Sequence, residues 1–350
     1  MNFQPEIIAW YLHNKRELPW RNTSDAYIIW LSEIILQQTR VEQGMPYFNR
    51  FLAHFPTVRD FAAASEAEIL KLWEGLGYYS RGRNMLHTAK VIVEQYNGVF
   101  PTQYEQLIKL KGIGDYTAAA ISSFSAKESR AVVDGNVFRV LARYFGIDLP
   151  INSPAGRKAF NTLATDLIQG QDPSIYNQAI MEFGALQCKP KAPLCESCPL
   201  RADCFAFNNN QTQELPVKLK AAAKRVRHFN YFVMEKDGLF LMKQRNAGDI
   251  WQQLYDFPLV ETGREHYADP ESFQKATFEL FGSHPVLRPV INKKHVLTHQ
   301  IIYVQFFALD NNIANFNTKA GYKWLTRAGL AAVPKPNVIN DFVNFYLTKL

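Results

Sequence analysis

Four cysteines fall within one short stretch, CKPKAPLCESCPLRADC, which runs from Cys188 to Cys204. The chain has 4 cysteines in all, so none is left to build a disulfide framework elsewhere. Four thiolates in one loop can bind a tetrahedral zinc ion or a four-iron cluster. The stretch therefore predicts a metal centre, and the residues alone leave zinc and iron open. The expected ligands are Cys188, Cys195, Cys198 and Cys204.

Length and composition predict an ordinary globular protein of two domains. The chain has 350 residues, of which 47% are hydrophobic and 20% charged, and this excludes a disordered or collagen-like polypeptide. Its net charge of +7 permits a polyanionic partner without requiring one. No apolar signal-peptide core and no membrane-length apolar run is present, so we expect a cytoplasmic protein without membrane association.

The chain from Phe3 to about Phe207 has apolar residues at helical spacing, interrupted by glycine and proline. This pattern predicts a mainly helical first domain. The expected helices are Ala26–Val41, Ala67–Leu76, Arg83–Tyr96, Thr117–Phe124, Val137–Phe145, Lys158–Gln169 and Tyr176–Leu186.

Residues 208–227 are polar and then basic, which predicts a linker. Its cations fit either a solvated connector or a tether that contacts phosphates; they are Lys218, Lys220, Lys224, Arg225 and Arg227. Beyond the linker the apolar period changes to two, and Asp237-Gly238 predicts a hairpin turn. We therefore expect a smaller mixed α/β or α+β domain. Its expected strands are Phe229–Glu235, Leu239–Gln244, Ile301–Leu309 and Tyr322–Leu325, with a helix over Pro270–Phe281.

A glycine-rich turn lies in LIKLKGIGDYTAAA, residues 107–120. Gly112 and Gly114 flank one apolar residue, and a helix is expected to begin immediately afterwards. Free N–H groups at that helix start can hold a phosphate, with Lys109 and Lys111 nearby. The alternative is a tight turn that only joins two helices.

Two carboxylates stand out. Glu33 lies in the apolar stretch IIWLSEIILQQTR, where burial would raise its pKa and suit it to general-acid chemistry. The alternative is an exposed position on an otherwise buried helix. Asp134 precedes the expected helix Val137–Phe145, so it fits an N-cap, and capping is compatible with a catalytic role.

The cysteine spacing directly after a helical domain resembles the iron–sulfur loop of the endonuclease III and MutY branch of DNA glycosylases. The glycine turn resembles the helix–hairpin–helix of that superfamily, and VVDGNVFRVLAR matches the segment that bears its catalytic aspartate. The resemblance implies a mainly α helix–hairpin–helix glycosylase domain over residues 1–207 whose cysteines bind [4Fe–4S]. It also implies that Lys189, Lys191 and Arg201 face DNA.

Tyr116 decides between two chemistries within this resemblance. Members of the endonuclease III type carry a lysine at this position, whose amine forms a Schiff base, whereas MutY-type adenine glycosylases carry a tyrosine. Tyr116 thus implies base removal without strand cleavage. By the same resemblance Glu33 protonates adenine N7, Asp134 stabilises or captures the sugar cation, and Asn136 orients the site.

The resemblance also assigns contacts to DNA and to the flipped base. Side chains that enter the duplex would be Gln38 and Tyr78, with Gln37 beside them. Further residues would line the adenine pocket or hold a phosphate through main-chain amides: Trp20, Arg21 and Gln178 for the pocket, and Gly112 and Gly114 for the phosphate.

The second domain, residues 228–350 after the linker 208–227, resembles the Nudix fold. The helix that binds metal in Nudix hydrolases would be Pro270–Phe281, which offers only Glu271 and Glu279. We therefore expect recognition without hydrolysis. Where the family inspects 8-oxoguanine with an aromatic-Ser-His triplet, this chain has Leu297, Thr298 and His299, and the replacement leaves the strength of that preference open.

The expected function is that of a monofunctional adenine DNA glycosylase acting on double-stranded DNA with adenine opposite 8-oxoguanine or guanine. The resemblance implies a bacterial, cytoplasmic monomer held at the nucleoid by its DNA. Alternatives are an endonuclease III-like lyase on oxidised pyrimidines and a non-catalytic iron–sulfur DNA-binding protein. A Nudix hydrolase is disfavoured by the missing acidic residues.

Overall fold

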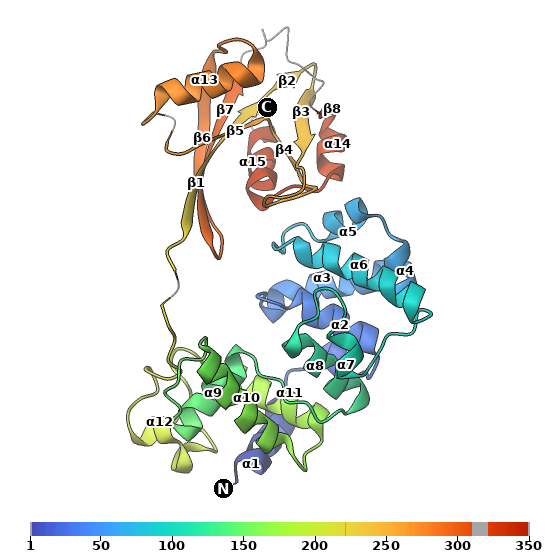
Figure 1. The fold of residues 1–350 in the computed structure, drawn as a ribbon, viewed down its shortest axis with the longest axis vertical. Helices are drawn as coiled ribbons and strands as arrows, with labels where there is room; N and C mark the ends of the chain where they lie inside the picture. The colour runs from blue at the N-terminus through green and yellow to red at the C-terminus, as the bar shows by residue number, and fades with distance from the viewer. Residues whose placement is uncertain (1, 221, 266, 310–320, 349–350) are drawn as a thin grey trace. The chain divides into compact units, whose positions relative to one another are not determined.

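Helices form most of the chain as far as Asn208, and two β-sheets dominate from Arg225 onward (Figure 1). The computed structural model describes residues 2–220, 222–265, 267–309 and 321–348. The chain divides into two units. Unit 1 comprises Met1–Ala64 and Asn84–Ala221, and unit 2 comprises Ser65–Arg83 and Ala222–Leu350. In the described ranges, none of the helices has the length and apolarity needed to cross a membrane.

Helical segments occur in the following order. They are α1 (Phe3–Asn14), η1 (Pro19–Arg21), α2 (Ala26–Ile35), α3 (Val41–His54), α4 (Val58–Ala63), α5 (Glu66–Leu72), α6 (Ser80–Gln95), α7 (Tyr104–Leu107), α8 (Asp115–Ala126), α9 (Gly135–Phe145), α10 (Pro154–Ile168), α11 (Pro173–Leu186), η2 (Arg201–Asp203) and α12 (Phe205–Asn208).

Two expected helices end earlier than their apolar pattern predicts. The helix expected over Ala26–Val41 is two helices, because α2 ends at Ile35 and α3 begins at Val41. Between them Gln38 has φ +56°, a left-handed conformation that a right-handed helix cannot contain. Similarly, α5 ends at Leu72 and Gly75 follows with φ +104°. The apolar pattern continues through both turns, so periodicity alone gave the wrong ends.

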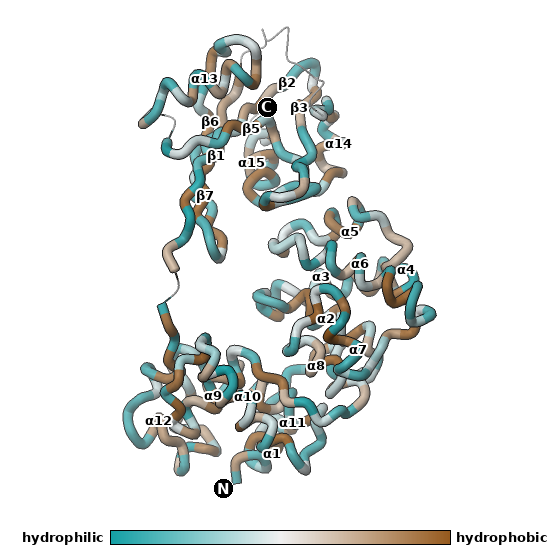
Figure 2. The backbone as a smooth tube through the Cα atoms, in the orientation of Figure 1, coloured by the Kyte–Doolittle hydropathy of each residue, from teal (hydrophilic) through white to brown (hydrophobic). Residues whose placement is uncertain are grey.

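Packing in unit 1 brings together helices that are distant in sequence. α1 and α9 both contact α11, and α8 contacts α2 and α11. One shared core contains Phe3, Phe160, Tyr176 and Phe183, all nearly inaccessible to solvent. The tube in Figure 2 alternates between brown and teal along these helices because each has an apolar and a polar face. This packing places the starts of α8 and α9 near the middle of α2 and α11.

Unit 2 contains two sheets with these elements: β1 (Arg225–Val233), β2 (Glu235–Lys236), β3 (Leu239–Gln244), β4 (Tyr255–Asp256), β5 (Leu259–Thr262), α13 (Pro270–Phe281), β6 (Leu287–Val296), β7 (Gln300–Leu309), β8 (Tyr322–Leu325), α14 (Arg327–Ala332) and α15 (Asn337–Leu347). The first sheet has the order β5-β1-β7-β6, with β1 and β7 parallel. The second has the order β2-β3-β4, and β8 also pairs with β3. The expected hairpin is confirmed, since Asp237 and Gly238 join β2 to β3 with φ of +52° and +74°.

A helix covers each face of the first sheet, as the labels α13 and α15 show in Figure 1. Successive strand residues point to opposite faces. Phe306 accordingly stacks on Phe342 of α15, with ring centroids 3.9 Å apart. Its neighbour Phe307 stacks on Phe232, which in turn contacts Phe273 and Phe281 of α13. Apolar residues that alternate along the strand therefore contribute to two separate cores, one against α15 and one against α13.

The strand β6 was not expected from the sequence. It lies at the edge of the sheet, contains Pro289 and carries a polar run from Asn292 to His295. Its register to β7 shifts between Pro289 and Ile291, which accommodates a proline that cannot donate to the ladder. An edge strand with one solvated face lacks the apolar signal of a central strand.

The expected linker is wrong at its C-terminal end, because β1 begins at Arg225. Arg227 is only 6% exposed and forms ion pairs with Asp249 and Glu261 at 2.7 and 2.6 Å. Its charge is therefore neutralised inside unit 2, so it contacts neither solvent as a free connector nor phosphate as a tether. Of the expected linker, residue 221 lies outside the described residues.

We predict that Phe342→Ala lowers the free energy of unfolding of unit 2 by about 3–5 kcal/mol, since the fully buried ring leaves a cavity against Phe306. Denaturant unfolding of the full chain measures the change. Phe278→Ala is the control, because that ring on α13 is 47% exposed, and we expect a change within about 0.5 kcal/mol. Equal effects of the two substitutions would contradict this account of the core.

Candidate active site

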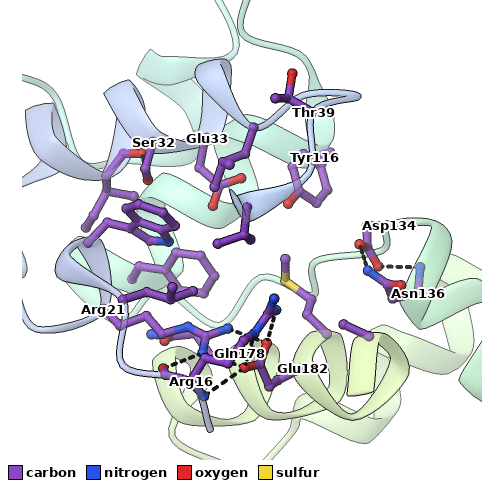
Figure 3. A pocket seen from close by; sticks show the side chains of 18 residues that line it. Arg16, Arg21, Ser32, Glu33, Thr39, Tyr116, Asp134, Asn136, Gln178 and Glu182 are labelled. Carbon is purple, nitrogen blue, oxygen red and sulfur yellow. Dashed lines mark hydrogen bonds and ion pairs between the residues drawn. The ribbon is translucent and has the colours of Figure 1, made fainter. Parts of the chain in front are cut away.

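A pocket of about 190 Å³ lies in unit 1 between α2, α8, α9, α11 and the segment around η1 (Figure 3). It brings together most of the residues expected to catalyse base removal or to line the adenine site. From the sequence predictions it contains Trp20, Arg21, Glu33, Tyr116, Asp134, Asn136 and Gln178. A second cavity of about 310 Å³ shares Glu33, Tyr116 and Asp134 and adds Gln37 and Gln38.

Glu33 points into the pocket from the middle of α2, near Tyr116 (Figure 3). Burial raises the pKa of its carboxyl to about 7; the charge of Asp134 adds to the rise, whereas a hydrogen bond with Tyr116 and the charge of Arg21 oppose it. A carboxyl with this pKa holds a proton near neutral pH and can release it. This is the property that a general acid requires.

Tyr116 lies in the first turn of α8, two residues after the N-cap residue Gly114. Burial raises the pKa of its hydroxyl well above the ordinary value, and the charges of Glu33 and Asp134 raise it further. The phenol therefore stays neutral and serves as a hydrogen-bond donor to Glu33. No lysine lines either cavity in the described part of the chain.

Asp134 is the N-cap of α9, as its sequence position predicts. Its Oδ1 accepts hydrogen bonds from the backbone N–H groups of Asn136 and Val137, both at 2.8 Å. Its Oδ2 accepts from the side-chain amide of Asn136 at 2.7 Å. Burial raises the pKa of Asp134, and these three hydrogen bonds oppose the rise because they favour the ionised form. Capping and placement at the pocket thus coexist in one residue.

Arg139 fixes the orientation of Asn136. Its guanidinium, 7% exposed, donates to Asn136 Oδ1 at 2.9 Å, so the amide NH₂ must face Asp134. It also donates to the carbonyl oxygens of Gly184 and Cys188 at 2.6 and 2.7 Å. One buried cation therefore joins the turn that contains Asp134 and Asn136 to the start of the cysteine loop.

The sequence did not predict the buried ion pairs that Glu182 forms with Arg16 and Arg21. Glu182 is 1% exposed and accepts paired hydrogen bonds of 2.6–2.9 Å from both guanidinium groups. Burial alone would raise the pKa of Glu182, but these hydrogen bonds and the charge of Arg21 lower it to about 2. Of the three carboxyls that line the pocket, Glu33 thus has a pKa near 7, whereas Glu182 is ionised at neutral pH. A signal was available, since Glu182 follows Gln178 by four residues and shares its helix face.

Gln178 and Trp20 are each fixed by a neighbour. The hydroxyl of Tyr11 donates to Gln178 Oε1 at 3.0 Å. The indole of Trp20 packs edge-on against Phe48, with ring centroids 4.9 Å apart. Both side chains therefore present fixed surfaces to the pocket, which favours recognition of a planar ligand.

The glycine turn has the geometry that its sequence predicts. Gly112 has φ +83°, and a Cβ there would lie 2.9 Å from Cβ of Asn84, so only glycine fits. Gly114 has open space where its Cβ would be, which leaves the N-terminus of α8 accessible. Main-chain N–H groups are therefore available to an anion at this point.

Two residues expected to enter DNA have left-handed backbones without being glycine. Gln38 has φ +56° in unit 1, and Tyr78, which is 42% exposed, has φ +48° in unit 2. Such conformations cost about 1–3 kcal/mol and concentrate at functional sites. Gln37, next to Gln38, donates from Nε2 to Thr117 Oγ1 at 3.3 Å. Only the backbone geometry reveals this feature of Gln38 and Tyr78.

Leu297, Thr298 and His299 form the tight turn between β6 and β7 in unit 2. Leu297 is partly buried, whereas Thr298 and His299 are exposed. The N–H of Leu297 donates to the carbonyl of Gln300, and Lys224 donates to the carbonyl of Leu297, both at 2.8 Å. Thr298 forms a hydrogen bond with the hydroxyl of Tyr78. The triplet is thus presented at the tip of a supported hairpin.

The cysteine loop fits a group that takes four sulfur ligands. All four thiols are free and partly buried, and Arg143, 3% exposed, donates to Cys188 Sγ at 3.4 Å. Its other donors bind the carbonyls of Lys189, Pro190 and Leu215, so a buried cation sits where thiolate charge would collect. In the described residues no three His, Cys, Asp or Glu side chains are arranged to hold a metal ion. The fit therefore rests on the donor set and on Arg143.

Comparison with known proteins identifies the class first. Residues 31–160 match the family of HhH-GPD superfamily base excision DNA repair proteins, and residues 230–344 match the NUDIX domain. The solved structure of a thermostable thymine-DNA glycosylase matches 59% of this chain and 95% of its own chain, with 29% sequence identity and a TM-score of 0.55. Fold and pocket thus define a base-excision DNA glycosylase, and the expected fold class is confirmed.

Curated relatives then identify the family. The adenine DNA glycosylase of Buchnera aphidicola subsp. Baizongia pistaciae is 36% identical over 73% of this chain and 73% of its own length. The adenine DNA glycosylase of Mus musculus is 41% identical over 61% of this chain and 43% of its own length. The chain belongs to the adenine DNA glycosylase family, as its motifs predict.

We predict that Glu33→Gln changes the pH dependence of stability. A rise in pKa from 4.5 to about 7 means that the folded state binds the Glu33 proton more tightly than the unfolded state does. The wild type therefore loses up to about 3 kcal/mol relative to the variant as pH rises from 4.5 through 7. Denaturant unfolding should give the same free energy of unfolding for wild type and Glu33→Gln at pH 4. At pH 8 the variant should be the more stable of the two.

The control for this experiment is Glu94→Gln, since Glu94 is exposed on α6 and outside the pocket. Its stability should follow that of the wild type at both pH values. Parallel curves for wild type and Glu33→Gln would mean that Glu33 is not desolvated in the folded protein.

Proposed function

We propose that this chain is a monofunctional glycosylase that removes adenine from double-stranded DNA in which the adenine lies opposite 8-oxoguanine or guanine. The observation that carries the proposal is the state of Glu33, a carboxyl with a pKa near 7 in a pocket beside Tyr116 and Asp134. Adenine is a poor leaving group as an anion, so its departure needs an acid that is still protonated near neutral pH.

The proposed reaction has two steps. Glu33 gives its proton to adenine N7 while the bond from C1′ to N9 breaks and the bonding electrons move to the base. The carboxylate of Asp134, held by three N–H donors, stabilises the positive charge left on the sugar. Glu33 then takes a proton from a water molecule that adds to C1′. The products are adenine and an abasic site.

Other pocket residues would bind and orient the base. Trp20 offers an aromatic surface, and Gln178 offers an amide to a base edge. The ionised Glu182 keeps Arg16 and Arg21 in place, and the positive charge of Arg21 favours the ionised form of Glu33 after proton transfer. These groups support base removal, and the lack of a lysine in the described lining supports hydrolysis rather than Schiff-base chemistry.

In this proposal residues 1–207 carry the glycosylase activity, and the C-terminal domain, whose first strand β1 begins at Arg225, inspects the base opposite the target. Leu297, Thr298 and His299 would make that inspection, with Leu297 as an apolar wedge. Gln38 and Tyr78 would enter the duplex, and the amides after Gly112 and Gly114 would hold a phosphate. Hydrolysis by a Nudix mechanism is disfavoured because α13 carries only Glu271 and Glu279.

The test uses duplexes with adenine opposite 8-oxoguanine or guanine, and a duplex with thymine glycol. We predict adenine release from the first two, with strand scission only after hot alkali, and no scission of the third. Glu33→Gln should lower the excision rate by at least about 10²-fold while DNA binding persists. Scission of the thymine-glycol duplex without alkali would support a lyase, and binding without any excision would support a non-catalytic protein.

We also propose that Cys188, Cys195, Cys198 and Cys204 bind a [4Fe–4S] cluster. When bound, the cluster supplies four iron–thiolate bonds that tie the loop together, and Lys189, Lys191 and Arg201 of this loop would face DNA. Arg201 is paired with Glu196 at 2.7 Å, so its contribution would require that exposed pair to open.

Metal analysis of the purified protein tests this second proposal. We predict about four iron atoms and about four sulfides per chain, and their loss in Cys198→Ser, because a serine hydroxyl replaces one thiolate ligand. Ser197→Ala is the control in the same loop, since its exposed hydroxyl bonds only weakly to the Leu194 carbonyl at 3.5 Å. One zinc ion in place of iron would contradict the proposal.

A further inference from the structure

The loop Trp73–Tyr79, here called the Tyr78 loop, belongs to unit 2 together with the C-terminal part of the chain. Three of its residues have positive φ: Gly75 at +104°, Gly77 at +71° and Tyr78 at +48°. Glycine adopts this conformation freely, but tyrosine does so at a cost that surrounding contacts must offset. The contacts that hold Tyr78 in place are therefore of functional interest.

Contacts from within the same segment hold one side of the loop. The indole of Trp73 donates to the carbonyl of Gly77 at 2.9 Å. Arg81 donates to the same carbonyl at 3.2 Å and to that of Leu76 at 3.3 Å. The Arg81 guanidinium also lies 5.1 Å from the Trp73 ring and 5.7 Å from the Tyr78 ring. These contacts fix the carbonyl groups directly before Tyr78.

A second set of contacts comes from Pro334–Asn337, the segment that leads from α14 into the first residue of α15, here called the Lys335 clamp. The hydroxyl of Tyr79 donates to the carbonyl of Lys335 at 2.9 Å and lies 3.4 Å from Asn337 Oδ1. Asn337 Nδ2 donates to the carbonyl of Gly75 at 3.3 Å. The loop is thus bonded to the clamp on both sides of Tyr78.

Lys335 is the buried centre of this clamp. Its side chain is 1% exposed, and its ammonium donates to the carbonyls of Leu330 and Val333 at 2.5 and 2.8 Å. It also lies 3.6 Å from Oε1 of Glu74, a residue of the Tyr78 loop. A buried ammonium is costly unless each donor has a partner, so these contacts fix the backbone of the clamp. The hydroxyl of Tyr78, at the far end of its side chain from the loop backbone, forms a hydrogen bond with Thr298 Oγ1 in the β6–β7 turn.

We propose that the Lys335 clamp is a positioning element that holds Tyr78 in the conformation needed to enter the duplex. This inference rests on the proposed role of Tyr78. Lys335, Asn337 and Tyr79 line neither of the two described cavities that contain Glu33, and in this proposal they act only through the Tyr78 loop. Because Tyr78 is also bonded to Thr298, the clamp keeps the inserted side chain in register with the residue that inspects the opposite base.

A double-mutant cycle on the full chain tests the proposal. Tyr79→Phe with Asn337→Ala removes the hydrogen bonds that these two side chains form between loop and clamp, and it leaves Tyr78 and the Lys335–Glu74 ion pair unchanged. Single-turnover excision of adenine opposite 8-oxoguanine should slow about tenfold in this clamp variant. On a Tyr78→Ala background the same two changes should slow excision less than about twofold, because the side chain that they position is already absent.

The matched control is Tyr346→Phe with Asn344→Ala, which removes the same groups from α15 outside the clamp and should leave the rate unchanged. Melting temperatures of all variants report their folding. Tyr79→Phe alone is the milder variant if the pair unfolds, and a slowing of about threefold is then expected.

Three results would overturn the inference, and they are distinguishable. Equal slowing with and without Tyr78 would show a general effect on the fold. An unchanged rate in the clamp variant, with slow excision by Tyr78→Ala, would leave the proposed role of Tyr78 intact and remove the clamp. A normal rate in Tyr78→Ala would instead remove the proposed role of Tyr78, and the clamp inference with it.

Discussion

Desolvation of the Glu33 carboxyl is the constraint on which the chemistry of the candidate active site depends. A carboxyl in water is ionised at neutral pH, and only a pocket closed by several helices raises its pKa to about 7. Tyr116 and Asp134 reach the same pocket from the starts of α8 and α9. The helical packing of unit 1 therefore also determines the pH at which the Glu33 carboxyl loses its proton.

A second carboxylate shows the same physics with the opposite result. Glu182 is as buried as the core side chains, yet two arginines keep it ionised. Its neighbour in the pocket, Glu33, receives only one hydrogen bond from a neutral phenol and the more remote charge of Arg21. The two carboxyls thus differ in their charged partners, and this difference separates a protonatable carboxyl from a fixed charge.

Arg139 and Arg143 extend this arrangement to the cysteine loop. Arg139 orients Asn136 and holds the Cys188 carbonyl, while Arg143 contacts the Cys188 thiol one helical turn later. Both arginines are nearly inaccessible and donate mainly to backbone oxygens, so they fix loop geometry as well as charge. The turn with Asp134 and the cysteine loop are consequently parts of one hydrogen-bonded structure.

Sequence alone determined what depends on neighbours a few residues apart. The cysteine spacing, the glycine turn with φ +83° at Gly112, the Asp134 cap and the strand alternation that separates Phe306 from Phe307 are all local patterns. Only the tertiary structure decided that α2 ends at Ile35, that Arg227 is paired inside unit 2, and that Glu182 meets Arg16 across 166 positions. Ion pairs and buried protons depend on which distant helices pack together, and local periodicity does not encode that choice.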